Sequence, residues 1–462
     1  MVRRVVVVGG GVSGLATAYR LLRDDPAPEV TVLEASGSAG GKLTTTRVGD
    51  LELETGPDAF VARKPWAVDL CRALGLELVE PRARDAFVWT ERGLSPLPRS
   101  ALGIPCEVDD LIRWPGISRR GRARALADLV RRPRPPEGDE SIGSLVRRRM
   151  GDEVAERLTA PLLGGLFAGD LDRLSVRAAF PELARWERDF ESLIRGAKAA
   201  TRAAADAGPI FQRPRDGVDR LPAALLDAIG PERVRTRTRA TSIERSDRGH
   251  AVLAGGAAFE ADAVVLATPA FASADLVTSV APDAAGALAE IPYASTAVVP
   301  LVYAEGTADA LPEATGFVVP SGRAPMTAAT FLSRKWPNPA YGDRAVVRCF
   351  VGAVGFEDVL ESPDGDIVDA LARHLSALLP LPERPEDSAV VRWPRSMPQF
   401  EVGHLERVRA IDEALPPGIF VAGNAYLGVG VADAVRSAGE AARLVRDHLS
   451  RRAADGLEER VP

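Results

Sequence analysis

Cysteine and histidine are scarce in this chain, and their positions exclude two kinds of site. The three cysteines of the 462-residue sequence lie far apart and include no C-x-x-C pair: Cys71, Cys106 and Cys349. This usage predicts no disulfide framework and favours a reducing compartment, so we expect a cytoplasmic protein. The four histidines are equally scattered: His250, His374, His404 and His448. Their spacing matches no metal-ligand pattern, so we expect no metal site.

Long apolar runs, lysine and a strong net charge are also missing. No run reaches about 18 apolar residues, so we expect no transmembrane segment and at most peripheral membrane contact. Because Met1-Val-Arg-Arg runs directly into a strand-like segment, we expect no signal peptide. The net charge of −6 argues against nucleic acid as a partner. Arginine supplies nearly all basic residues, a bias typical of GC-rich bacterial genes, so arginine counts are weak evidence of function. The only lysines are Lys42, Lys64, Lys198 and Lys335.

The first forty residues have the pattern of a dinucleotide-binding unit. Val5–Val8 form a short apolar run, typical of a buried parallel strand, and the glycines of a G-x-G-x-x-G motif follow directly: Gly9, Gly11 and Gly14. An apolar-periodic helix and a second strand, Glu29–Leu33, come next, and Glu34 ends that strand. The glycines permit a tight turn and close approach to a pyrophosphate at the helix N-terminus, and Glu34 is placed to accept hydrogen bonds from a ribose. The alternative is a glycine-rich turn in a fold without ligand.

Two further glycine-rich turns follow soon after, at Gly40-Gly41-Lys42 and at Gly56-Pro57-Asp58-Ala59-Phe60. A flavin dinucleotide lies extended and needs a second close-approaching backbone, so these turns favour a flavin over a nicotinamide. Two ordinary surface turns are the alternative, and the residues alone leave it open. A helix is expected over Arg63–Leu76, ending at Gly75.

The next region is predicted to be mainly helical. A hairpin is expected within 85–99, an irregular link around Pro98–Pro105, and helices over 141–160 and 182–207. The segment Arg113–Arg134 contains eight arginines and one acid, Asp128. This basic stretch either attracts anionic lipid or an anionic substrate, or is a solvated helix face in an arginine-rich chain.

The nucleotide-binding pattern then resumes, interrupted by a second insertion. A helix over 221–229, short strands over 234–236, 240–245 and 251–253, and a buried strand beginning at Ala263 are expected first. Strands over 297–303, 316–319, 345–351 and 389–393, with a helix near 365–379, predict a mixed sheet. A strand, a glycine-rich turn and a helix to about His448 close the chain, before a polar tail predicted to fray from Arg451. The helix after this last turn is placed either to stabilise negative charge on a flavin or simply as one more strand–helix unit.

Several motifs together resemble one family, the FAD-dependent protoporphyrinogen and coproporphyrinogen III oxidases of haem biosynthesis, within the amine-oxidase-like flavoproteins. These motifs are GGGVSGLATAYRL, LEASGSAGGKL, ETGPDAFVARK, PLPRSALGIP, APLLGGLFAGDLDRLSVRAAFP, RPRDGVDRLP and VAGNAYLGVGVADAVRSAG. The resemblance covers nearly the whole chain and is greater to the bacterial coproporphyrinogen III type. It implies an α/β fold with α+β insertions: a Rossmann-like FAD-binding domain, a mixed-sheet substrate domain and a helical insertion.

The resemblance implies a discontinuous organisation. The FAD-binding domain is predicted over 1–80, 208–272 and 403–450, the substrate-binding domain over 81–99 and 273–402, the helical domain over 100–207, and a flexible tail over 451–462.

The resemblance also implies which residues contact the non-covalent FAD, a set that lies in the glycine-rich turns and at one strand start. This set is Gly9, Gly10, Gly11, Val12, Ser13, Gly14, Glu34, Ala35, Gly41, Lys42, Gly56, Pro57, Asp58, Ala59, Phe60, Ala240, Val429, Gly430 and Val431. The substrate contacts that it suggests are Arg63, Lys64, Arg99, Gly169, Phe317 and Val318. The basic members of this second set are candidates for binding propionate carboxylates.

The reaction implied is the oxygen-dependent six-electron oxidation of coproporphyrinogen III to coproporphyrin III, with release of hydrogen peroxide. Flavin N5 carries this chemistry, and no residue stands out as a catalytic base. Protoporphyrinogen IX is the alternative substrate, and an amine or carotenoid oxidase on the same fold is a further alternative. From another class, a flavin-binding scaffold that delivers porphyrin to a haem-pathway enzyme remains open. Downstream haem-pathway enzymes are the expected protein partners.

Overall fold

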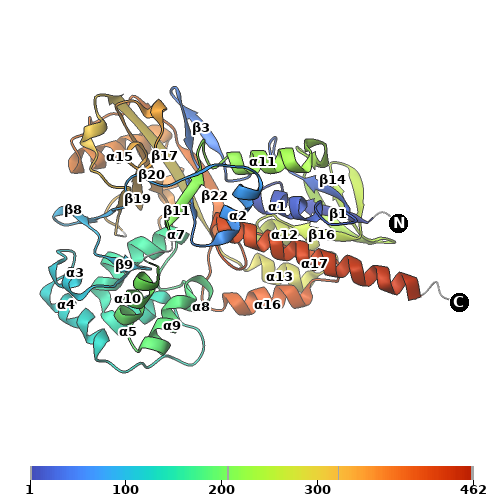
Figure 1. Cartoon of the computed structure of the whole chain (residues 1–462), viewed down its shortest axis with the longest axis horizontal. Helices are drawn as coiled ribbons and strands as arrows, with labels where there is room; N and C mark the ends of the chain where they lie inside the picture. Colours follow the sequence, from blue (N-terminus) through green and yellow to red (C-terminus); the bar gives the residue numbers. More distant parts are fainter. Residues whose placement is uncertain (1–2, 205–207, 321, 459–462) are drawn as a thin grey trace.

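The computed structural model describes residues 3–204, 208–320 and 322–458, arranged around two sheets and one group of helices (Figure 1). The first sheet is parallel and has the order β12-β2-β1-β16-β23. Its strands are β1 (Arg4–Val8), β2 (Glu29–Leu33), β12 (Val234–Arg235), β16 (Ala263–Leu266) and β23 (Ile419–Val421). Segments from both ends and the middle of the chain therefore meet in one sheet. This arrangement confirms the predicted Rossmann-like core.

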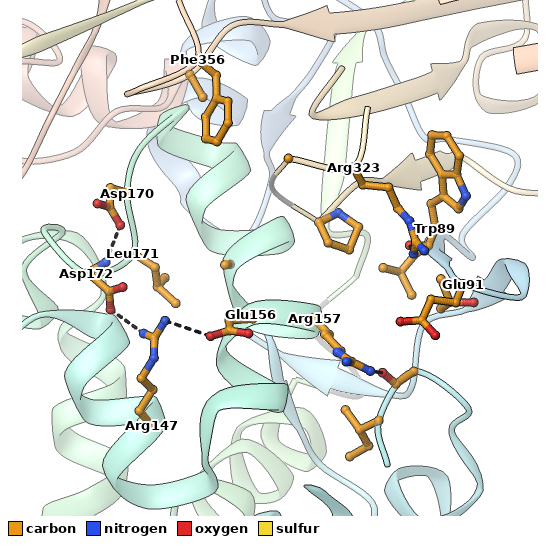
Figure 2. A pocket seen from close by; sticks show the side chains of 18 of the residues that line it. Trp89, Glu91, Arg147, Glu156, Arg157, Asp170, Leu171, Asp172, Arg323 and Phe356 are labelled. Atoms are coloured by element: carbon orange, nitrogen blue, oxygen red, sulfur yellow. Dashed lines mark hydrogen bonds and ion pairs between the residues drawn. The ribbon is translucent and has the colours of Figure 1, made fainter. Parts of the chain in front are cut away.

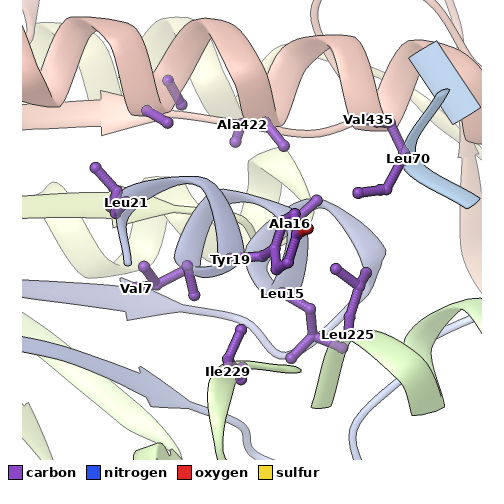
Figure 3. Packing of buried hydrophobic residues seen from close by; sticks show 14 of the residues in the cluster. Val7, Leu15, Ala16, Tyr19, Leu21, Leu70, Leu225, Ile229, Ala422 and Val435 are labelled. Atoms are coloured by element: carbon purple, nitrogen blue, oxygen red, sulfur yellow. The ribbon is translucent and has the colours of Figure 1, made fainter. Parts of the chain in front are cut away.

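Both faces of this sheet are covered, which explains why its strands are apolar at consecutive positions. Val5 and Val7 belong to a core formed with four helices: α1 (Val12–Leu21), α2 (Pro65–Ala73), α11 (Arg220–Ile229) and α17 (Val431–Glu458) (Figure 3). Val6 and Val8 face the opposite core. That core contains β13 (Ala240–Ser246), β14 (Gly249–Ala254), β15 (Ala257–Ala261), α12 (Ala270–Val277), α13 (Pro282–Ala289) and α16 (His404–Ala414). Full burial of each valine contributes about 1.5–3 kcal/mol.

The second sheet is mixed, as the sequence predicts. Its order is β21-β17-β20-β19-β18-β7-β8, and β22 also pairs with β17. The strands are β7 (Phe87–Thr90), β8 (Gly93–Pro96), β17 (Tyr293–Glu305), β18 (Gly316–Val318), β19 (Ala328–Phe331), β20 (Arg344–Val351), β21 (Asp387–Ser388) and β22 (Val391–Pro398). Helix α15 (Asp364–Leu378) packs on one face through Ile367, Leu371 and Leu375.

The helical group lies beside the mixed sheet, below it in the view of Figure 1. Its elements are α3 (Val108–Arg113), α4 (Arg119–Leu126), α5 (Ile142–Met150), α6 (Asp152–Val154), a π-helix η2 (Ala155–Gly164), α7 (Gly165–Phe167), α8 (Val176–Ala179), α9 (Pro181–Phe190) and α10 (Leu193–Ala203). Asp128 anchors this group, because its buried carboxylate accepts hydrogen bonds from Arg149 Nε at 2.6 Å and Ser192 Oγ at 2.6 Å.

Several local expectations differ from the structure. The helix expected over 141–160 breaks at Gly151, whose φ of 93° is unfavourable for a helix, and continues as the π-helix. The link expected to be irregular contains a short hairpin, β9 (Ser100–Ala101) with β10 (Ile104–Pro105). The helix expected from Arg63 begins only at Pro65, because Lys64 has extended backbone angles.

The remaining differences concern the chain end and elements that the sequence pattern missed. The predicted frayed tail is wrong up to Glu458, since α17 continues to that residue, and 459–462 lie outside the described residues. Strand-like residues are expected up to Glu54, and the structure has β3 (Thr45–Val48) and β4 (Leu51–Glu54) there. The elements that the sequence pattern missed are β5 (Phe60–Val61), β6 (Leu78–Val79), β11 (Phe211–Pro214), α14 (Leu332–Lys335), β15, β19, α12, α13 and α16. The domain boundaries stay a prediction.

Candidate functional site

The turn between β1 and α1 has the geometry that a phosphate-binding loop requires. Gly9 has a φ of 109°, and a Cβ at Gly14 would lie 1.9 Å from the Gly9 carbonyl oxygen. Helix α1 begins after Gly11 with neither a capping side chain nor an acidic residue in its first turn. Its first amide groups are therefore open to an anion, which the helix dipole favours.

Glu34 lies at the end of β2, beside this turn. Its carboxylate accepts hydrogen bonds from the Gly10 amide at 2.8 Å and the Ser36 amide at 2.7 Å. The two amides fix the direction of the carboxylate, and lone pairs remain on it for the hydroxyl groups of a ribose.

The second glycine-rich turn packs directly on the first and on the third. Gly11 and Gly40 form a β-bridge, and a Cβ at Gly41 would lie 3.1 Å from Gly11 Cα. A Cβ at Gly56 would lie 1.8 Å from the Lys42 carbonyl oxygen. Each pair of neighbouring turns is thus in close backbone contact, which glycine permits because it has no side chain. Lys42 donates to the Ser396 carbonyl at 2.7 Å, and desolvation lowers the pKa of its ammonium to about 8.

The turn from Gly56 to Phe60 is held from behind by a buried ionic network. The Asp58 carboxylate accepts hydrogen bonds from Lys335 Nζ at 2.8 Å and Trp336 Nε1 at 2.9 Å, and lies 3.1 Å from Arg348 Nη2. Arg348 also donates to the Gly56 carbonyl at 3.1 Å. The Asp58 side chain is therefore buried and directed at these three partners.

The C-terminal turn before α17 is held by Asp433. A Cβ at Gly428 would lie 2.4 Å from Asp433 Cγ, so the turn packs closely on this carboxylate. Lys64 Nζ lies 2.6 Å from the same carboxylate. Since Lys64 immediately precedes α2 and Asp433 lies in the first turn of α17, the ion pair joins two elements that border the predicted cofactor site.

The other predicted cofactor residues lie in the same turns or near them. Val12 and Ser13 begin α1, Ala35 follows Glu34 and is exposed, and Ala240 begins β13. The rest are distributed over the third turn and the C-terminal turn: Pro57, Ala59, Phe60, Val429, Gly430 and Val431. Their contacts with a cofactor stay a prediction.

A cleft of about 1100 Å³ separates the helical group from the mixed sheet (Figure 2). One wall comes from α5, η2 and the segment 169–173, and the other from the β7–β8 turn and the loops after β18 and β20. The Val354 amide donates to the Ala168 carbonyl at 2.9 Å and joins the two walls. The volume lies at the upper end of small-molecule sites, which are typically about 300–1,000 Å³.

Charge is unevenly distributed along the cleft. In Figure 2, Asp170, Asp172, Glu156 and Arg147 lie on the left, whereas Arg157 and Arg323 lie on the right. Arg147 forms ion pairs with Asp172 and, at 3.5 Å, with Glu156, so its charge is compensated. The other charged lining residues are Glu91, Arg92 and Arg173.

The predicted substrate residues are not brought together. Only Gly169 lines the cleft. Arg99 is exposed and forms an ion pair with Asp110 at 2.9 Å, and Arg63 donates to the Ala204 carbonyl at 3.3 Å. Lys64 is occupied by Asp433, as described above.

The two predicted substrate residues of β18 differ in their surroundings. Phe317 is 2% exposed in the core with α15, and Val318 packs against the core of the helical group. Contacts of these six residues with a substrate stay a prediction.

Sequence reasoning missed the arginines of the cleft for a clear reason. In a chain whose basic residues are nearly all arginine, Arg157 and Arg323 carry no local signal that separates them from the others. The sequence instead suggested the basic stretch Arg113–Arg134 as either a binding surface for an anion or a solvated helix face. Of its arginines, Arg113, Arg119 and Arg120 are exposed. The segment that joins α3 to α4 nevertheless reaches the cleft through Trp114 and Ser118.

Two other kinds of feature are absent from the part of the chain that the structure describes. Over 3–204, 208–320 and 322–458, no helix combines the length and apolar character needed to cross a membrane. The same residues contain no group of three or more His, Cys, Asp or Glu side chains placed to hold a metal ion.

Comparisons with known proteins give one consistent picture. Residues 12–446 match the family model for flavin-containing amine oxidoreductases. A coproporphyrinogen III oxidase from Bacillus subtilis is 33% identical over 94% of this chain and 96% of its own length. A chloroplastic protoporphyrinogen oxidase from Oryza sativa is 31% identical over 96% of this chain and 88% of its own. The crystal structure of a protein from Exiguobacterium, provisionally named protoporphyrinogen oxidase, has a TM-score of 0.86 at 31% identity over 97% of this chain and 99% of that one.

Proposed function

The chain belongs to the flavin-containing amine oxidoreductases, and we propose that it is an FAD-dependent oxidase that converts coproporphyrinogen III to coproporphyrin III. The observation that carries this proposal is the near-full-length similarity, at 33% identity, to a coproporphyrinogen III oxidase. Molecular oxygen is the proposed electron acceptor and hydrogen peroxide the second product, within haem biosynthesis. The protein is proposed to act in the cytoplasm and to pass its product to later haem-pathway enzymes.

The residues present fit a non-covalently bound FAD. We propose that the open amides at the start of α1 bind the pyrophosphate, that Glu34 binds the adenosine ribose, and that the extended chain lies along the bare backbones of Gly41 and Gly56. We propose that segments 1–80, 208–272 and 403–450 form the FAD-binding domain. When bound, FAD supplies a two-electron acceptor that oxygen can restore.

The protein's own contribution is binding and orientation. The cleft between the helical group and the mixed sheet has room for a tetrapyrrole, and Gly169 leaves backbone without a side chain at its wall. A Cβ at Gly169 would lie 2.4 Å from Gln399 Oε1, and Gln399 Nε2 in turn donates to the Phe167 carbonyl at 2.7 Å. Gln399 therefore fixes the 167–169 backbone, which keeps the wall rigid where the macrocycle is proposed to lie.

Protoporphyrinogen IX is the second candidate substrate. The similarity to the Oryza sativa enzyme, at 31% identity, supports this alternative. It keeps the same cofactor and the same cleft and differs only in the substituents of the macrocycle.

The test is an anaerobic titration of the purified yellow protein with each porphyrinogen, followed by admission of air. The proposal expects bleaching by coproporphyrinogen III, return of the yellow colour in air and formation of coproporphyrin III. Faster turnover of protoporphyrinogen IX would favour the second candidate. A flavin that neither porphyrinogen bleaches would refute the oxidase and leave a porphyrin-delivering scaffold.

A further inference from the structure

Two arginines that line the cleft, Arg157 and Arg323, have hydrogen-bond donors that are not paired with a carboxylate at hydrogen-bond distance among the described residues. Arg323 donates through Nη1 to the Trp89 carbonyl at 3.0 Å, and among the residues described it has no carboxylate within 4.0 Å. Its guanidinium also lies over the Trp89 ring, 5.9 Å from the ring centre. One backbone carbonyl and one ring thus orient this cation, and neither compensates its charge.

Arg157 is oriented in the same manner from the opposite wall. Its Nη1 donates to the Gly116 carbonyl at 3.2 Å. The nearest carboxylate is Glu153, 3.9 Å away, and Glu153 already accepts hydrogen bonds from the Ser118 amide and hydroxyl at 2.6 Å each. The positive charge of Arg157 is therefore only weakly compensated, and several of its N–H donors stay available to a ligand.

Carboxylates compensate two of the other three cleft arginines, and the third, Arg92, is exposed in the β7–β8 turn and has no carboxylate within 4.0 Å among the described residues. Arg147 is compensated by Asp172 and Glu156, and Arg173 lies 2.9 Å from Glu401. In Figure 2 both Arg157 and Arg323 extend toward the open space of the cleft, whereas Arg147 lies on the other side, bound to Asp172 and Glu156, and it also pairs with Asp152 at 3.3 Å.

We infer that Arg157 and Arg323 form a clamp that binds carboxylates of the substrate and so fixes its orientation in the cleft. The inference rests on the proposed function for the identity of the ligand, a macrocycle with four carboxylates. Guanidinium groups form two parallel hydrogen bonds with a carboxylate, and the geometry of both arginines is fixed in advance by backbone carbonyls. Because the two residues come from opposite walls, one bound molecule connects the helical group to the mixed sheet.

Glu91 carries a negative charge near the two arginines, and its removal should have the opposite effect on substrate affinity to removal of either arginine. Its exposed carboxylate lies between Arg157 and Arg323 in the view of Figure 2, without an ion pair to either among the described residues. Its negative charge repels a second carboxylate and lowers the affinity of the clamp for the substrate.

The experiment compares Arg157→Met, Arg323→Met, the double variant and Glu91→Gln in the FAD-loaded protein. Two quantities are measured: the KM for coproporphyrinogen III, and the Kd of coproporphyrin III from quenching of its fluorescence at several salt concentrations. Each arginine variant is expected to raise KM and Kd about tenfold, the double variant more, with kcat within about twofold. Glu91→Gln is expected to lower both constants. Arg185→Met, which removes an exposed arginine paired with Glu182 outside the cleft, serves as the matched control.

The salt dependence separates a clamp from a structural role. Affinity in the unaltered protein should fall as salt rises, and the double variant should lose most of this dependence. Arg157→Lys should recover part of the affinity, because it keeps the charge and loses the paired hydrogen bonds.

Equal KM, Kd and salt dependence in the double variant and the unaltered protein would overturn the clamp and leave the oxidase intact. Failure of the unaltered protein to oxidise coproporphyrinogen III would refute the proposed function instead. The binding arm would then decide the clamp alone: weaker, salt-independent binding of coproporphyrin III by the double variant would support it, and unchanged binding would refute it.

Discussion

The Asp58 carboxylate lies 3.1 Å from Arg348 Nη2, and this buried pair connects the predicted flavin-facing turn to β20 of the mixed sheet. Lys335 Nζ is 2.8 Å from the same carboxylate. Burial opposes ionisation of Asp58, yet the charges of Arg348 and Lys335 outweigh it and hold the pKa of this carboxyl below its usual range. Ion pairs thus connect the proposed cofactor site to β20, the strand whose following loop lines the proposed substrate cleft.

Removing the Asp58 charge should loosen this arrangement. Asp58→Asn leaves Arg348 and Lys335 buried without their shared counter-ion, so we expect a loss of about 3–5 kcal/mol in the free energy of unfolding. We also expect weaker FAD binding, because Arg348 positions the Gly56 carbonyl. Urea denaturation and FAD titration measure the two effects.

Asp50→Asn is the matched control, since the Asp50–Arg344 pair joins the same two regions at the surface. Its expected cost is much smaller than that of Asp58→Asn, because solvent screens the exposed Asp50 carboxylate. A cost for Asp58→Asn no larger than that of the control would contradict the role given to the buried network.

His404 should make the protein sensitive to mild acid. This fully buried imidazole stacks on Phe400 and its Nε2 lies 3.0 Å from the Tyr426 carbonyl. Desolvation dominates over this hydrogen bond and lowers the pKa of His404 from 6.5 to about 4. The unfolded chain therefore binds more protons than the folded one between these two values, and stability falls as the pH decreases through that window.

The expected loss from His404 over this window is about 3 kcal/mol. His404→Gln, which keeps a donor for the Tyr426 carbonyl, should flatten the dependence of unfolding free energy on pH between about 6.5 and 4. Equal pH profiles for the variant and the unaltered protein would show that His404 is not the group responsible.

Asp128 is the anchor of the helical group. Besides Arg149 and Ser192, its carboxylate accepts a hydrogen bond from the Ile194 amide at 3.0 Å, and the side chain has no exposure. Asp128→Asn removes the nearer of two carboxylates beside the buried Arg149, and leaves it only Glu187 at 3.6 Å, so we expect a loss of about 3 kcal/mol in unfolding free energy. Asp189→Asn, at an exposed pair with Arg188, should change stability by about 1 kcal/mol or less. A similar small change at Asp128 would refute the anchor.

The same residue shows why part of the structure was not predictable from the sequence. Asp128 is the one acid among the eight arginines of 113–134, and the sequence pattern suggested a solvated or ligand-binding face. Its partners, Arg149 and Ser192, are 21 and 64 residues away, so their meeting depends on how three helices pack. The clamp arginines pose the same problem, because Arg323 is oriented by Trp89, 234 residues distant.

The glycine turns, by contrast, were predictable because their requirements are local. The strand at Val5, the turn at Gly9 and the helix after Gly11 lie within a few residues, and each has its own sequence signal. The side chains of β1 alternate between the two cores on either face of the sheet, and this alternation depends only on neighbouring residues. The strand, turn and helix near the C-terminus likewise depend on signals within a few residues. The strand at Ala263 was predictable in the same way, since a short apolar run bounded by small residues is typical of a buried parallel strand, whereas its pairing with β1 is a long-range feature that the sequence did not predict.

Gly14 provides the most direct test of that local reasoning. Gly14→Ala places a methyl group 1.9 Å from the Gly9 carbonyl oxygen, so the turn or the helix must shift. We expect a loss of about 1–3 kcal/mol in unfolding free energy and a marked loss of FAD affinity. Gly286→Ala is the control: Gly286 is exposed within α13, and no atom lies within 4 Å of its added Cβ. This second variant should gain about 0.5–1 kcal/mol, because alanine is the better helix former, and should bind FAD normally. If Gly14→Ala bound FAD as tightly as Gly286→Ala, the close packing of α1 on β1 would not be what shapes the phosphate-binding turn.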